Sequence, residues 1–151
     1  MIFVDTSVWI SAFRGDQAIV TELSALLDDD VVALAAPVRV ELLVGASRRD
    51  HERLARVLMA LPIFVPSADA WLRTEEWAKE GRMHGETFGV ADMIIASTCH
   101  EAGGLLWSFD DDFQRMARLE WFKLYTSLPK PKGGARRKKA RATSRATVRR
   151  T

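Results

Sequence analysis

Short apolar runs alternate along this chain with longer stretches in which apolar residues recur every three or four positions. The short runs have the length and composition of β-strands and span 2–5, 31–35, 63–65, 105–108 and 121–125. The longer stretches have helical periodicity and span 7–14, 18–28, 38–46, 50–60, 68–82, 90–102 and 112–119. Alternating strands and helices are typical of a parallel sheet with helices on both faces, so the pattern predicts an α/β fold.

Proline and glycine stand at several of the expected helix boundaries. Pro37 can open a helix, because the N–H that proline lacks has no partner in a first helical turn. Gly45 and residues 103–104 can end helices, and residues 15–16 can form a turn. The chain has no internal repeat.

Four acidic residues stand beside or within these apolar segments. Asp5 ends the first strand, and Asp110 follows the fourth. Glu41 interrupts the apolar third helix, and Asp92 stands in the first turn of the sixth. Open α/β sheets carry their sites at the carboxyl ends of the strands. We therefore interpret the four acids as one site.

The expected helix faces favour convergence of these acids. Glu41 shares its face with the apolar residues 37, 38, 44 and 45, which should face the sheet, so we expect its side chain to point inward. Asp92 shares its face with Ile95 and Ala96, which places it on the buried side of its helix.

Neighbouring carboxylates destabilise a fold unless something neutralises them. Two unit charges about 6 Å apart repel by roughly 3 kcal/mol at an effective dielectric near 20. A divalent cation removes this conflict, and all-oxygen ligation suits Mg²⁺ or Mn²⁺. Zn²⁺ prefers His and Cys, and the three histidines show no metal-ligand spacing. The acids therefore predict a Mg²⁺ or Mn²⁺ site.

Each acid also has a purely structural interpretation. Asp92 and Asp110 begin helices, where carboxylates stabilise the first turn by capping and through the helix dipole. Glu41 could form a buried ion pair with Arg39 or Arg14. Asp5 is the hardest to explain structurally, and the metal site is favoured by the joint arrangement of one acid in each α/β unit.

Length and composition limit the other possibilities. A chain of 151 residues with 48% hydrophobic content can bury one core but not two. No run approaches the roughly 18 apolar residues of a membrane span, and the opening run lacks the basic flank and cleavage site of a signal peptide. Cys99 is the single cysteine and can form no internal disulfide. These features predict a cytoplasmic protein without a membrane segment.

Charge divides the chain into two parts. Residues 129–151 hold 10 of the 22 Lys and Arg and none of the 20 acids, so residues 1–128 carry 12 basic and 20 acidic groups, a net charge of −8. The basic part has almost no large apolar residue, so we expect a domain over 1–128 followed by a disordered tail over 129–151. Such a tail could hold RNA phosphates, or it could be a solubilising extension.

Four motifs together resemble those of a known family. They are Val4-Asp5-Thr6-Ser7, Val40-Glu41-Leu42, Val90-Ala91-Asp92-Met93-Ile94-Ile95-Ala96 and Ser108-Phe109-Asp110-Asp111-Asp112-Phe113. In this order and at these spacings they resemble the PIN domain, and more narrowly the VapC-type ribonuclease toxins of prokaryotic toxin–antitoxin systems. The resemblance covers about residues 1–127. The last motif of the family usually begins with Thr, where this chain has Ser108 and so keeps a hydroxyl.

The resemblance implies a three-layer α/β/α fold with a central parallel sheet and a Mg²⁺- or Mn²⁺-dependent endoribonuclease. By position, Asp5, Glu41, Asp92 and Asp110 would be the catalytic acids, and Asp5, Asp92 and Asp110 would hold the metal. Asp112 would be an auxiliary acid, and Thr6 or Ser7 would orient the metal shell. The resemblance further implies an RNA substrate, an antitoxin bound in a groove near the first helices, and a homodimer formed through other helices.

An acidic pocket repels RNA, so basic groups should flank it. The candidates are Arg14, Arg39, Arg48, Arg49, Arg82 and Arg115, with residues 82–85 forming part of a loop over the pocket. Two other functional classes stay open. One is a non-catalytic RNA-binding module of the same fold that uses the basic tail. The other is a phosphotransfer or phosphatase domain built on Asp5, although Ser7 stands where that class places a second acid.

Overall fold

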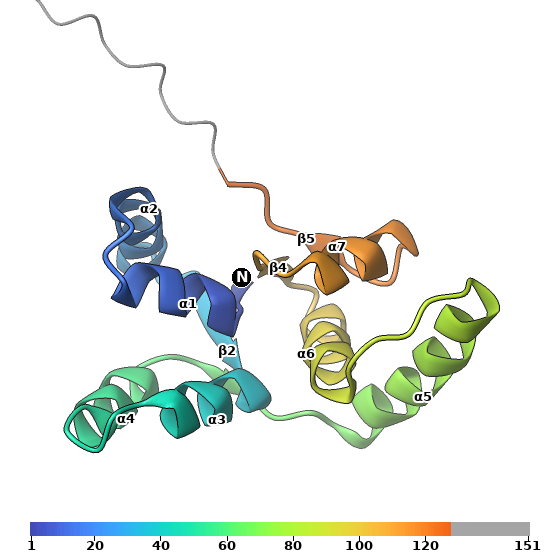
Figure 1. The fold of residues 1–151 in the computed structure, drawn as a ribbon, viewed down its shortest axis with the longest axis horizontal. Coiled ribbons are helices and arrows are strands. Elements are labelled where there is room, and N and C mark those ends of the chain that lie inside the picture. The colour runs from blue at the N-terminus through green and yellow to red at the C-terminus, as the bar shows by residue number, and fades with distance from the viewer. Residues whose placement is uncertain (128–151) are drawn as a thin grey trace, which may run out of the picture.

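The computed structural model describes residues 1–127, which form five strands and seven helices (Figure 1). The strands are β1 (Ile2–Val4), β2 (Val32–Ala35), β3 (Ile63–Phe64), β4 (Leu105–Trp107) and β5 (Lys123–Leu124). The helices are α1 (Thr6–Phe13), α2 (Gln17–Asp28), α3 (Ala36–Gly45), α4 (His51–Met59), α5 (Ala68–Met83), α6 (Val90–Glu101) and α7 (Asp111–Arg118). Every predicted element is present, with ends that differ from the prediction by at most two residues.

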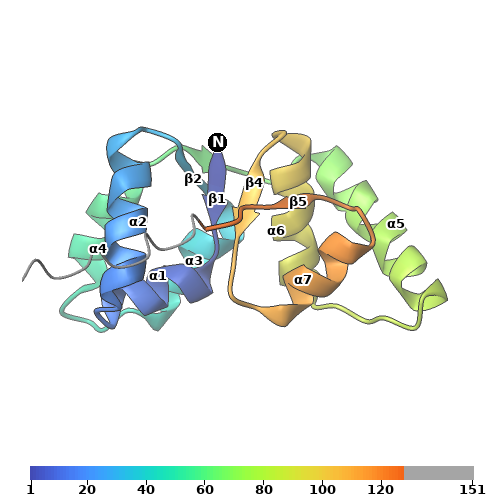
Figure 2. The ribbon, with the colours of Figure 1, turned by 90° about the horizontal axis from the view of Figure 1, so that it is seen from above.

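The strands form one sheet in the order β3-β2-β1-β4-β5, and every neighbouring pair is parallel. Ile2 on the central strand β1 pairs with Val32 on one side and with Leu105 on the other. In Figure 2, α1 to α4 lie on one side of the strands and α5 to α7 on the other. This arrangement follows from right-handed crossovers, because the chain first moves outward from β1 through β2 to β3 and then returns to β4 and β5.

The direction of winding reverses between β1 and β4. The connection that leaves β1 runs toward β2, whereas the connection that leaves β4 runs toward β5. Such a reversal opens a crevice at the carboxyl ends of the two strands, and open α/β sheets bind their ligands there. Asp5 directly follows β1, and Ser108 directly follows β4. The topology therefore brings these two residues to the same end of the sheet.

The core lies between the sheet and its two helical layers. Phe3 and Trp107 on adjacent strands are almost fully buried, as is Phe113 on α7. Gly104 allows the chain to enter β4 against this core, because a Cβ there would lie 2.7 Å from the Phe3 ring. Cys99 is also buried, and burial raises the pKa of its thiol to about 12, in agreement with a packing role.

The boundary after residue 128 and the basic tail 129–151 lie outside the described residues, and both stay predictions. Within residues 1–127, no helix has the length and apolar character that crossing a membrane requires.

Candidate active site at the carboxyl ends of β1 and β4

Asp5 lies at the carboxyl end of β1 and is 5% exposed. Its Oδ2 accepts hydrogen bonds from the Ser7 hydroxyl at 2.6 Å, from the Ser108 hydroxyl at 2.8 Å and from the Ser7 backbone N–H at 3.2 Å. Asp5 is also the N-cap of α1. Three donors on one oxygen stabilise a buried carboxylate and fix its orientation.

The same two serines connect β1 to the segment that carries Asp110. The Phe109 backbone N–H donates to the Ser7 hydroxyl, and the Asp110 backbone N–H donates to the Ser108 hydroxyl, both at 3.0 Å. The two hydroxyl oxygens lie 3.3 Å apart. The serines therefore set the position of the Asp110 backbone relative to Asp5, across about 100 residues of sequence.

Glu41 is exposed, and the prediction that it points inward from an apolar face is wrong. Helix α3 instead buries Val38 and Leu42, whereas Val44 is 82% exposed. Because α3 is apolar on several sides, its sequence alone leaves the buried face undetermined. Glu41 accepts a hydrogen bond from the Thr6 hydroxyl of α1, and among residues 1–127 no Lys or Arg forms an ion pair with it. The structure thus does not contain the buried pair with Arg39 or Arg14.

Asp110 and Asp112 stand at the start of α7. Asp110 is its N-cap, and its Oδ1 accepts a hydrogen bond from the Asp112 backbone N–H at 2.8 Å. This cap is the structural role that the sequence left open for Asp110, and it employs one of the two carboxylate oxygens. Asp112 forms an ion pair with Arg115 at 2.6 Å.

Asp92 lies in the first turn of α6, beside the N-cap residue Gly89. Within residues 1–127, no hydrogen-bond donor and no cationic side chain is paired with its carboxylate. Asp92 therefore does not cap α6 by a hydrogen bond. A Cβ at position 89 would lie 2.7 Å from Asp92 Oδ2, so the carboxylate rests directly on the glycine backbone.

The charge environment of Asp92 shows that the acids lie near one another. Desolvation by burial is the largest cause that raises the pKa of Asp92, from 3.8 to about 6. The negative charges of Asp110, Asp5, Asp112 and Glu41 add to this effect, in that order. All the acids singled out in the sequence thus act electrostatically on one carboxylate.

These carboxylates are the types of ligand that a divalent cation prefers. Their side chains do not, however, form a complete coordination site. Carboxylate oxygens are the ligands that Mg²⁺ and Mn²⁺ prefer, and the Asp92 carboxylate has no partner among residues 1–127. In the same part of the chain, no three His, Cys, Asp or Glu side chains are positioned to hold an ion together. Binding would therefore require rotation of side chains, for which the exposed Glu41 and Asp110 have room.

Comparison with known proteins agrees with this arrangement. The family model of the PIN domain matches residues 2–119. The chain belongs to the PIN-domain family. Ribonuclease VapC18 of Mycobacterium tuberculosis is 30% identical over 125 residues, which cover 79% of this chain and 90% of that protein. VapC ribonuclease Mb1587 of Mycobacterium bovis is also 30% identical over 125 residues, with 79% and 93% covered. The resemblance to PIN domains of the VapC type is confirmed.

Several solved structures have the same fold. VapBC2 from Rickettsia felis, bound to a DNA fragment from its promoter, matches with a TM-score of 0.69 at 20% identity, covering 83% of this chain and 98% of that one. FitAcB from Neisseria gonorrhoeae matches with a TM-score of 0.64 at 24% identity, covering 83% and 97%. At these identities the likeness concerns the fold alone, and it confirms the predicted three-layer architecture with a central parallel sheet.

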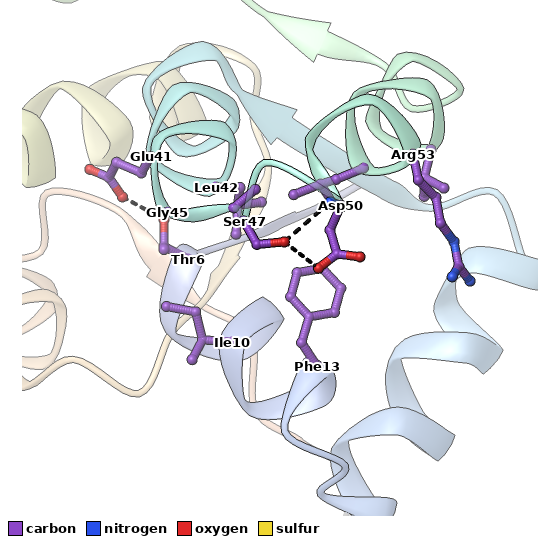
Figure 3. A pocket seen from close by; sticks show the side chains of 12 residues that line it. Thr6, Ile10, Phe13, Glu41, Leu42, Gly45, Ser47, Asp50 and Arg53 are labelled. Atoms are coloured by element: carbon purple, nitrogen blue, oxygen red, sulfur yellow. Dashed lines mark hydrogen bonds between the residues drawn. The ribbon is translucent and has the colours of Figure 1, made fainter.

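A groove of about 680 Å³ adjoins the acidic site of this PIN domain on the side of Glu41 (Figure 3). Helix α1 supplies Thr6, Ile10 and Phe13 to one wall, and α3 and α4 supply the other. The Thr6–Glu41 hydrogen bond lies at one end of the groove, where it connects α1 to α3. Phe13 is 57% exposed there, so the groove offers apolar surface next to the acids.

Three residues that contribute to the site of the PIN domain were not assigned a role from the sequence. Ser108 was noted only for its hydroxyl, and Gly89 stands at the start of a helix, where glycine is common. Glu86, which forms an ion pair with Arg115, gave no signal, because an acid in a connecting segment resembles any solvated acid. The loop expected over residues 82–85 is shorter, since α5 continues to Met83.

Proposed function

We propose that this PIN domain is a metal-dependent endoribonuclease that hydrolyses RNA phosphodiester bonds and acts as the toxin of a toxin–antitoxin pair. The observation that carries the proposal is the unpaired Asp92 carboxylate at the first turn of α6, exposed to the negative charge of four other acids. Such an accumulation of charge is suited to a divalent ion and has no benefit for folding. The curated relatives named above are ribonucleases, which supports RNA as the substrate.

In this proposal Asp5, Asp92 and Asp110 hold Mg²⁺ or Mn²⁺, and Glu41 completes the catalytic acids. When bound, the ion supplies an activated water and neutralises the charge that develops on the phosphate. The serine hydroxyls hold Oδ2 of Asp5, so its Oδ1 would be the oxygen available to the ion.

Neighbouring residues support the acids in the proposed site. Thr6 orients Glu41 by its hydrogen bond. Ser7 orients Asp5 and, through the Phe109 N–H, the segment before Asp110. Asp112 acts as an auxiliary acid whose charge reaches Asp92.

An antitoxin protein is the proposed occupant of the groove between α1, α3 and α4. Apolar walls that include Ile10 and Phe13 suit the apolar face of a bound peptide, and Glu41 at the edge of the groove suits a basic side chain. Several structures with this fold are toxin–antitoxin complexes, including those from Klebsiella pneumoniae and Haemophilus influenzae. A bound antitoxin would thus sit beside the acids that the reaction requires.

We further propose that the protein forms a homodimer and acts in the cytoplasm. Exposed apolar side chains on α3 and α5 support a homodimer formed away from the groove, among them Val44 at 82% and Leu72 at 58% exposed. A toxin that cleaves cellular RNA and is neutralised by an antitoxin acts in the cytoplasm, which we propose as its location.

The central test is RNA cleavage by the full chain. We expect purified protein incubated with total cellular RNA and Mn²⁺ to produce new 5′ ends, detected by sequencing, and EDTA to prevent them. The Asp5→Asn variant should cut no RNA while its circular dichroism spectrum stays that of the wild type. RNA that is bound but uncut in the presence of Mn²⁺ would instead indicate the non-catalytic RNA-binding module.

Gly89→Ala tests whether the position of Asp92 matters for this activity. The added Cβ would lie 2.7 Å from Asp92 Oδ2, so the carboxylate must move. We expect turnover to fall by about 10-fold or more, because small displacements of catalytic groups are costly. The loss of stability should be about 1 kcal/mol, since alanine is a much poorer N-cap than glycine. Val90→Ala, at the adjacent exposed position, is the control and should retain full turnover.

A further inference from the structure

Arg115 joins two segments that flank the acidic site. It lies on α7, where its Nη2 contacts Asp112 Oδ1 at 2.6 Å, and its Nη1 contacts Glu86 in the segment between α5 and α6. Its guanidinium carbon also lies 5.0 Å from the centre of the Phe88 ring. One side chain thus makes two ion pairs and a cation–π contact, and it is 35% exposed.

Besides this contact, the segment 84–89 packs against an aromatic neighbour and is hydrogen-bonded to the end of α5. Phe88 is buried and meets Trp121 edge to face, with ring centres 5.5 Å apart. The Arg115 guanidinium contacts the same phenyl ring. The Glu86 N–H donates to Gly81 at the end of α5 at 2.8 Å. Without Arg115, the ionic and cation–π contacts that tie this segment to α7 would be lost.

The same segment leads directly to Gly89, against which the Asp92 carboxylate packs. Gly89 follows Phe88 and is the N-cap residue of α6, where its carbonyl accepts a hydrogen bond from the Met93 N–H at 3.0 Å. The Asp92 carboxylate rests on Gly89 so closely that a methyl group would not fit between them. A shift of the backbone at 89 must therefore displace the carboxylate.

We propose that Arg115 is a positioning residue that anchors segment 84–89 to α7 through Glu86 and Phe88 and thereby fixes the Asp92 carboxylate in the acidic site. The proposal rests on the function proposed above, because it takes Asp92 to be a catalytic group. It differs from direct phosphate binding by Arg115, since both ends of the guanidinium already have carboxylate partners. Lysine cannot replace this function fully, because one ammonium cannot reproduce the fork of a guanidinium.

Four variants of the full chain test this assignment: Arg115→Gln, Arg115→Lys, Glu86→Ala and, as the control, Arg118→Gln. Arg118 is an exposed arginine of the same helix, and no ion pair involves it within residues 1–127. Three readouts are needed: amide hydrogen exchange over residues 84–93, Mn²⁺ affinity by calorimetry without RNA, and kcat and KM for RNA cleavage.

We expect Arg115→Gln and Glu86→Ala to speed exchange at the amides of positions 86 and 93, which donate to the Gly81 and Gly89 carbonyls. Both variants should also lower Mn²⁺ affinity and kcat by roughly 10–100-fold with little change in KM, as partners of ligating residues do. Arg115→Lys should fall between these variants and the wild type, and Arg118→Gln should match the wild type.

Two results would overturn the proposal. A KM raised at least 10-fold in Arg115→Gln, with kcat and exchange unchanged and no effect of Glu86→Ala, would make Arg115 a phosphate contact. Unchanged exchange and unchanged Mn²⁺ affinity in both variants would remove the link to Asp92. Absence of cleavage by the wild-type chain would reject the proposed function instead, and the exchange readout would still test the anchor.

Discussion

Asp92→Asn is expected to abolish RNA cleavage and at the same time to raise the melting temperature at neutral pH in the presence of EDTA. Loss of activity follows from the proposed role of the carboxylate. The gain in stability follows from its surroundings, because burial and four acidic neighbours disfavour the ionised form of Asp92 in the folded protein. Asparagine has nearly the same shape and carries no charge.

The pH dependence of this gain has a definite sign. The pKa of Asp92 is raised from 3.8 to about 6 on folding, so below pH 3.8 the group is neutral in both states and costs nothing. The penalty grows as the pH rises through this interval and is complete above about pH 6. The full shift corresponds to about 3 kcal/mol, and screening of this partly exposed group reduces it to about 1–2 kcal/mol. The expected gain is therefore roughly 3–8 °C.

Thermal unfolding of both proteins at pH 4 and pH 7.5 checks this expectation. The difference between Asp92→Asn and wild type should be present at pH 7.5 and nearly absent at pH 4. Asp69→Asn is a matched control, because Asp69 also lies in the first turn of a helix but is exposed. It should change stability little or lower it slightly through the helix dipole. Equal gains in the two variants would contradict the idea of mutually repelling acids around Asp92.

Simultaneous Ser7→Ala and Ser108→Ala substitutions are expected to cost about 3–5 kcal/mol of the free energy of unfolding. Both hydroxyls donate to one oxygen of Asp5, which is 5% exposed, and their removal leaves that oxygen with one longer hydrogen bond to the Ser7 N–H. Hydrogen bonds to charged groups contribute about 1.5–3 kcal/mol each, and a buried charge without partners is costly. The Phe109 and Asp110 N–H groups lose their acceptors as well.

Urea unfolding at neutral pH measures this loss. In an Asp5→Asn background the same two substitutions should cost at least 1 kcal/mol less, because a neutral amide depends less on the hydroxyl donors. Ser97→Ala is the comparison, since Ser97 is fully buried and donates to the neutral Ala70 carbonyl at 2.9 Å. Its cost should be about 1 kcal/mol. A cost of similar size per serine in all these variants would show that the charge of Asp5 is not what the serines stabilise.

The fold could be predicted from the sequence because its signals are local. Strands such as 105–107 are short apolar runs with glycine before them, and helices such as α2 show a clear helical period after a turn at residues 15–16. The positions of Asp5 and Asp110 at the ends of strands follow from the same pattern. Parallel topology then brings them to one edge of the sheet.

The directions and partners of the side chains within the site could not be predicted in the same way. Glu41 was expected to face the sheet. Helix α3 has apolar residues on several sides, however, and its packing against the rest of the domain buries Val38 and Leu42. The link between Arg115 and Glu86 joins residues 29 positions apart, and that between Ser108 and Asp5 joins residues 103 apart. No local pattern encodes such partners.

The amino-acid pattern alone is sufficient to predict the order of the elements, the α/β class and the acids at their ends, because burial of one side of a strand or helix makes apolar residues recur at regular intervals. Packing of the folded chain was needed to show that two serines hold Asp5, that Asp92 has no partner among residues 1–127, and that Arg115 connects Asp112 to Glu86. These contacts depend on distances between segments, which are set by packing of the whole domain.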